Sequence, residues 1–140
     1  MTSDQVQLIR QSFAELAIHQ EVGALVFYRR LFEIDPSLRP LFKGDIREQA
    51  QKLTDMLAAL IGMLESPAGL VAELKAMGAR HVGYGVKDEH YATVGTALLD
   101  MLAVTLDRKF TPEVREAWTA LYGAVESTMK AGAKEQTAPL

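Results

Sequence analysis

The chain has 140 residues, of which 49% are hydrophobic and 24% charged, and it carries a net charge of −3 and no cysteine. Such a chain typically forms one domain with a sizeable core, and its weak negative charge gives no basic field for nucleic acid or an anionic membrane surface. The lack of cysteine excludes disulfides, zinc–thiolate sites, iron–sulfur clusters and the covalent attachment of a c-type haem.

The sequence gives no membrane or export signal. Its longest apolar run, residues 56–64, is much shorter than the roughly 20 residues that cross a bilayer. Residues 1–13 are acidic and polar where a signal peptide would have basic residues followed by an apolar block. We therefore expect a cytoplasmic protein without membrane association.

Two helices are predicted before residue 35, each from apolar residues spaced three or four positions apart. Thr2 or Ser3 can cap the first helix. The apolar positions are Val6, Ile9, Phe13 and Leu16 in the first helix and Val22, Leu25, Tyr28 and Phe32 in the second. We expect these two faces to point into the core.

Polar residues followed by proline mark the starts of two further helical segments. Asp35 and Pro36 predict the N-cap and first residue of a short helical turn that ends near residue 42. Ser66 and Pro67 begin a later helical segment. Between them a long helix is predicted, with an apolar face formed by Ile46, Leu53, Leu57, Leu60, Ile61 and Leu64.

The segment after Pro67 carries the most unusual residue of the chain. Its apolar face of Leu70, Leu74 and Met77 continues to His81, and glycine at position 83 stops the helix shortly afterwards. A histidine on an apolar face is more often a core residue whose ring meets a carbonyl group. The alternative is a ligand directed at something buried, since neutral imidazole is a common metal ligand.

Two further helices complete an all-α prediction. Asp88 can cap a helix with Val94, Leu98, Met101 and Leu102 on one face, and Thr111 and Pro112 open a last helix with Val114, Trp118, Leu121 and Val125. No segment shows the polar–apolar alternation of a strand. We predict a single domain over residues 1–130 and a flexible tail over residues 131–140, where the apolar periodicity ends.

The usual catalytic and metal-binding motifs do not match. His19, His81 and His90 show no i, i+4 pair, and no nucleotide-binding loop or nucleophile elbow is present. We expect His19 in an exposed junction and His90 in a solvated first turn. Tyr28 and Gln49 fall on inward faces, as hydrogen-bonded core groups or, equally for Gln49, as a side chain that reaches solvent.

Four motifs in order resemble the globin family: "FYRRLFEIDPSLRPLF" at 27–42, "EQAQKL" at 48–53, "LKAMGARHVGYGVKDEHYATVG" at 74–95 and "EAWTALYG" at 116–123. The similarity covers about residues 3–130. It is greatest to bacterial single-domain globins and the haem domains of flavohaemoglobins, with a neuroglobin-like branch also plausible. The resemblance implies a globin fold of about six to eight helices that enclose a haem pocket.

The resemblance also implies roles for individual residues. His81 matches the proximal ligand of the iron in a non-covalent haem b. Tyr28, Gln49 and Leu53 match the distal positions that surround the gaseous ligand. The other implied haem contacts are Phe42, Lys52, Val86, Tyr91 and Val94.

The chain departs from the family pattern at two positions. Flavohaemoglobins join the proximal histidine to a tyrosine and a glutamate, but here Tyr91 is present while Ala133 takes the place of the glutamate. The distal residue is Gln49 and not histidine, so ligation by two histidines is not expected. We expect the second ring nitrogen of His81 to donate to a carbonyl group one turn back, near Met77 or Gly78.

The function implied by the resemblance is reversible O2 binding at a five-coordinate ferrous haem, with NO and CO as further ligands. High affinity from Tyr28 and Gln49 would suit oxygen binding, scavenging or sensing. The alternative is nitric oxide dioxygenation, which would need a separate flavin reductase because these 140 residues contain no flavin domain. A haem-free helical interaction module is a third reading.

Overall fold

The computed structural model describes residues 1–42, 44–64, 66–83 and 87–137, and within them it contains six α-helices, two short 3₁₀ helices and no strand. The α-helices are α1 (Ser3–Ile18), α2 (Gln20–Ile34), α3 (Ile46–Gly62), α4 (Pro67–Gly83), α5 (Asp88–Leu106) and α6 (Pro112–Thr137). The 3₁₀ helices are η1 (Pro36–Leu41) and η2 (Asp107–Lys109). The all-α prediction is therefore confirmed.

The helix starts follow local side-chain chemistry. The Thr2 hydroxyl oxygen accepts a hydrogen bond from the Gln5 backbone N–H, and the Gln5 side-chain oxygen accepts one from the Thr2 backbone N–H, which forms a capping box at α1. The Asp35 carboxylate accepts from the Ser37 amide at the start of η1. Thr111 caps α6 through the Val114 amide. These predicted caps are present.

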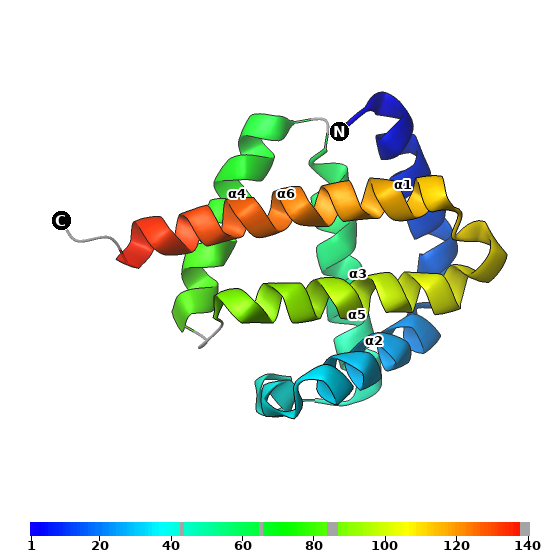
Figure 1. Ribbon diagram of the computed structural model, residues 1–140, viewed down its shortest axis with the longest axis horizontal. Coiled ribbons are helices and arrows are strands. Elements are labelled where there is room, and N and C mark those ends of the chain that lie inside the picture. The colour runs from blue at the N-terminus through cyan, green and yellow to red at the C-terminus, as the bar shows by residue number, and fades with distance from the viewer. Residues whose placement is uncertain (43, 65, 84–86, 138–140) are drawn as a thin grey trace.

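The helices cross one another and leave an internal space. Figure 1 shows α5 and α6 side by side, with α4 crossing α6 near its C-terminal end and α1 near its N-terminal end. On the other side, α2 packs on both α5 and α3. Under α6, the indole N–H of Trp118 donates to the Ser12 hydroxyl at 2.8 Å, so both buried polar groups have partners.

The predicted inward face of α2 is wrong in part. Val22 and Leu25 are more than half exposed, whereas Gly23 and Ala24 are buried. A Cβ atom at Gly23 would lie 3.3 Å from a Leu16 methyl group, which is a tight contact and shows how closely α2 meets its neighbours here. Close helix crossing, and not hydrophobicity alone, decides which side of α2 faces inward.

The last helix continues further than the sequence indicates. α6 reaches Thr137 and so includes seven residues of the segment expected to be a tail. Gly132 lies directly against the backbone of Lys75 in α4, and the Lys75 ammonium pairs with the Glu135 carboxylate at 2.9 Å. The apolar periodicity ends near residue 130 because this part of α6 packs through glycine and an ion pair. None of the helices described is long and apolar enough to cross a membrane.

Candidate functional site

A cavity of about 540 Å³ lies between α2, η1, α3, α4, α5 and α6. Cavities of about 300–1,000 Å³ are typical of small-molecule and cofactor sites. Hydrocarbon and aromatic side chains form most of the wall: Phe27, Leu38, Met56, Leu57, Leu60, Met77, Leu98, Trp118, Leu121, Val125 and Met129. Such a wall suits a large, mostly apolar occupant.

His81 enters this cavity from the last turn of α4. Its Nδ1–H donates to the Met77 carbonyl oxygen at 2.6 Å, one turn back, which confirms the predicted hydrogen bond. In this tautomer Nε2 carries the ring lone pair and is the nitrogen able to bind a metal. The His81 side chain is half-buried and ends the face that begins at Leu70.

Tyr28 from α2 and Gln49 from α3 meet in the wall of the same cavity. The Tyr28 hydroxyl donates to the Gln49 amide oxygen at 3.4 Å, which is a long and therefore weak hydrogen bond. Both side chains are at least 90% buried, so Gln49 does not reach solvent. Burial raises the pKa of Tyr28 to about 12, so the phenol keeps its proton, and hence its donor, at neutral pH.

Two alanines lie on the helices that carry Tyr28 and Gln49. Ala24 of α2 and Ala50 of α3 are fully buried, and these two helices pack on each other. Small side chains let two helix backbones approach closely, which brings the longer side chains beside them into contact. Tyr28 also packs on the Phe42 ring, with centroids 5.2 Å apart. Its position is therefore set by packing as well as by the hydrogen bond.

The third distal position, Leu53, lines this cavity as well, and so do the implied haem contacts that the structure describes: Phe42, Lys52, Tyr91 and Val94. Val86 lies outside the described residues. Lys52 is exposed, with no ion-pair partner in the described ranges, at the edge of an otherwise apolar wall. This placement suits the carboxylate edge of an amphipathic cofactor.

His90 differs from its expected place in a solvated turn. Its side chain is only 12% exposed and lines the cavity. Lys87, and not Asp88, is the N-cap of α5, and its amide donates to His90 Nδ1 at 3.0 Å. Nε2 of His90 lies 3.8 Å from the Asp35 carboxylate at the start of η1. His90 therefore contacts both the start of α5 and the start of η1. The sequence signal for its place in the cavity wall was its position four residues before Val94, on the same face of the helix.

Tyr91 lies near a glutamate of α6 at another position than the one expected from the family pattern. Ala133 lies in α6, but Glu126, two turns earlier on that helix, is close enough to act on Tyr91. Burial, followed by the charges of Asp88 and Glu126, raises the pKa of the Tyr91 phenol. The Tyr122 hydroxyl, a residue that the sequence did not single out, donates to the Tyr91 carbonyl oxygen and ties α6 to α5.

These residues fit a haem group. One imidazole is sufficient where the cofactor supplies the remaining iron ligands, as a porphyrin does. The mostly apolar cavity would accept the ring, Lys52 could reach a propionate, and Phe42 would offer an aromatic contact. Two polar groups, from Tyr28 and Gln49, are placed to meet a small ligand.

Comparison with known proteins agrees with this geometry. Residues 25–129 match the family model described as Globin. Neuroglobin from Danio rerio is 32% identical over 139 residues, covering 89% of this chain and 87% of that protein. Neuroglobin from Tetraodon nigroviridis is 29% identical over 146 residues, covering 94% and 92%.

Solved structures show the same arrangement of helices. An engineered carbene transferase form of RmaNOD, a candidate nitric oxide dioxygenase from Rhodothermus marinus, superposes with a TM-score of 0.81 at 27% identity, covering 96% of this chain and 94% of that one. A hexacoordinated haem protein from an anhydrobiotic tardigrade reaches a TM-score of 0.83 at 15% identity, covering 96% of both chains. The second likeness concerns the fold alone.

Proposed function

We propose that this chain, which belongs to the globin family and is therefore a haem protein for gaseous ligands, binds O2 tightly through Tyr28 and Gln49. The observation that carries the proposal is the meeting of these two polar side chains in the cavity that His81 also lines. When bound, haem b would supply a ferrous iron with one open coordination position. His81 would hold that iron through Nε2.

The protein's own contribution is to orient hydrogen-bond donors. The Tyr28 hydroxyl already lies within reach of Gln49, and exchanging that weak bond for one to a partly anionic ligand costs little. Each such bond contributes on the order of 1–2 kcal/mol, which is about tenfold in affinity. Two donors therefore favour slow ligand release, which suits scavenging or sensing better than bulk delivery.

An absorption spectrum of the purified protein tests the haem assignment. We expect a strong Soret band, a pyridine haemochrome of the b type, and a ferrous form that is mainly five-coordinate because Gln49 is a poor iron ligand. A protein purified from haem-supplemented cells without a Soret band would contradict the assignment and favour a haem-free helical module. A dominant low-spin ferrous spectrum without added ligand would contradict the open position.

Nitric oxide dioxygenation with a separate flavin reductase is the second candidate, and the likeness to RmaNOD favours it. The same Tyr28 and Gln49 donors would serve this reaction. NO consumption in air by the haem-loaded protein, with NADH and a flavoprotein reductase added, separates it from simple binding. Consumption no faster than that of the reductase alone would exclude turnover.

We place either activity in the reducing cytoplasm, in keeping with the lack of cysteine.

A further inference from the structure

A second cavity, of about 280 Å³, adjoins the proposed ligand pocket. It is lined by residues of α2, η1 and the start of α3, together with Phe42 and Gly44. Tyr28, Phe42 and Gln49 line both cavities and so form the partition between them. Any occupant of the second cavity would touch the two side chains proposed to hold the gaseous ligand.

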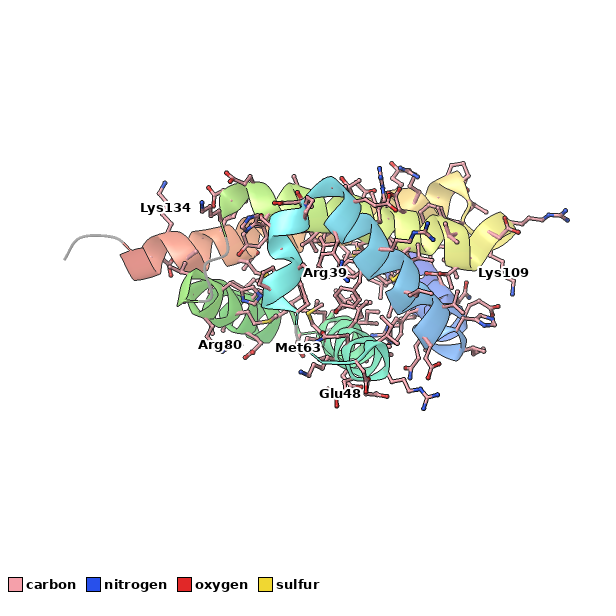
Figure 2. The ribbon with its side chains drawn as sticks, turned by 90° about the horizontal axis from the view of Figure 1, so that it is seen from below. Arg39, Glu48, Met63, Arg80, Lys109 and Lys134 are labelled. Atoms are coloured by element: carbon pink, nitrogen blue, oxygen red, sulfur yellow. The ribbon has the colours of Figure 1, made fainter. Side chains whose placement is uncertain are left out.

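Arg39 gives the second cavity its chemical character. Its guanidinium carbon lies 5.5 Å from the centroid of the Phe32 ring, which is another wall residue. A cation over an aromatic face is attracted by the ring, and the N–H groups of a guanidinium that do not face the ring can still donate to acceptors. Arg39 has no carboxylate partner in the described part of the chain. Arg39 is an exposed residue of η1, and Figure 2 shows it far from Lys109 of η2.

More hydrogen-bond donors line this second cavity than an apolar gas molecule could use. Arg39, Tyr28 and Gln49 together bring a guanidinium group, a phenol and an amide to one small space. Since one water occupies about 30 Å³ in the liquid, 280 Å³ leaves room for a four-atom ion with several waters. A guanidinium fork pairs best with two coplanar oxygens.

We propose that the second cavity binds a small planar monoanion, of the nitrate, nitrite or carboxylate class, between Arg39 and the Gln49 amide. Because Gln49 and Tyr28 also face the main cavity, the bound anion competes for their donors and shifts ligand affinity there. Only this second effect rests on the proposed function. The binding itself is a property of Arg39 and the partition, and it can be measured independently.

The test is a titration of the ferrous, CO-bound protein with sodium nitrate and, separately, sodium formate at constant ionic strength set with sodium chloride. CO closes the iron to anions, so iron binding cannot mimic the effect. ¹H–¹⁵N NMR follows the Arg39 Nε–H and Gln49 side-chain amide signals. The variants are Arg39→Gln, Arg39→Lys and, as a matched control on η2, Arg108→Gln.

We expect the two signals to move together and to saturate in the millimolar range with either planar anion. Arg39→Gln should weaken binding by about tenfold or more, because a charge-assisted hydrogen bond is lost, while Arg108→Gln leaves it unchanged. Arg39→Lys should fall in between, since it keeps the charge without the fork. Movement of Arg39 with Gln49 unmoved, or equal binding in Arg39→Gln, would overturn the proposal.

Discussion

His81 is the residue on which the proposed haem site depends. It ends an apolar helical face, and Met77 fixes its ring so that Nε2 can bind iron. We expect His81→Ala to lose haem during purification or to release it readily to an apoprotein acceptor. The control is His19→Ala, which changes an exposed residue between α1 and α2. A His81 variant with normal haem content and an unchanged ferrous spectrum would disprove the assignment.

Tyr28 should discriminate between gaseous ligands by charge. O2 takes on partial negative charge when it binds ferrous haem and CO does not, so only O2 gains much from a hydroxyl donor. We expect Tyr28→Phe to raise the O2 dissociation rate about tenfold or more, a loss of about 1–3 kcal/mol, with little change for CO. Stopped-flow ligand release measures both rates.

Gln49→Leu and the double variant complete that experiment. Gln49→Leu should act in the same direction but more weakly, because its amide sits on a longer side chain. The double variant should show a coupling energy, since the two side chains already contact each other at 3.4 Å. Equal effects on O2 and CO in the Tyr28 variant would mean that its ring acts only as a steric wall.

Contacts within one helix could be predicted from the sequence, whereas contacts between distant segments could not. The face that ends in His81 and its hydrogen bond one turn back could be predicted, because both depend on positions within one helix. The contact of His90 with Asp35 could not be predicted, since Asp35 lies in another segment, at the start of η1. Contacts between segments far apart in the chain leave no local pattern.

At the scale of elements, glycines set how closely α4 and α6 approach. A Cβ atom at Gly78 would collide with the Met129 carbonyl group, and this collision is with backbone and not with a movable side chain. Overpacking of this kind costs about 1–3 kcal/mol. We expect Gly78→Ala to lower the free energy of unfolding by at least the upper end of that range and to displace His81, one turn further along α4.

Gly123 in the same pair of helices provides the control. A Cβ atom there would have nothing within 4 Å, and alanine is favoured over glycine in helix interiors by about 0.5–1 kcal/mol. We expect Gly123→Ala to stabilise the protein slightly in urea denaturation followed by circular dichroism. A Gly78→Ala variant as stable as Gly123→Ala would show that the two helices can separate without cost.

Helix positions were more predictable than helix faces. Capping residues and prolines marked the starts of α1, η1, α4 and α6 because these signals act over three or four residues. The inward face of α2 was misassigned, because the small residues Gly23 and Ala24 are buried at a close crossing while the more apolar Val22 and Leu25 face outward. Helix spacing is a tertiary quantity that residue hydrophobicity does not encode.

At the scale of the whole molecule, the cavity is the feature that no single segment predicts. Five helices and η1 each add a few side chains to its wall, from Phe27 to Met129. The all-α class followed from periodicity alone. The identification of Tyr28, Gln49 and His81 as one site required the resemblance to a known family, because their three helices meet only in the folded chain.

The tyrosines of this cavity should make stability fall at high pH. Burial raises the pKa of Tyr28 from 10.0 to about 12, and the pKa values of Tyr91 and Tyr122 are raised as well, chiefly by burial. Between pH 10 and 12 the unfolded chain has lost the Tyr28 proton while the folded chain retains it. Unfolding then releases a proton, so the free energy of unfolding decreases as the pH rises through this interval and is unaffected below it.

The comparison with Tyr28→Phe isolates this contribution from the other groups that titrate in alkali. Urea midpoints of both proteins are measured as CO-bound ferrous forms from pH 8 upward, so that a tyrosinate cannot bind the iron. We expect the two curves to run parallel up to about pH 10, after which the wild type declines more steeply because only it carries the shifted phenol. Parallel curves up to pH 12 would mean that the Tyr28 hydroxyl is open to water and is not the buried donor that the proposed O2 site requires.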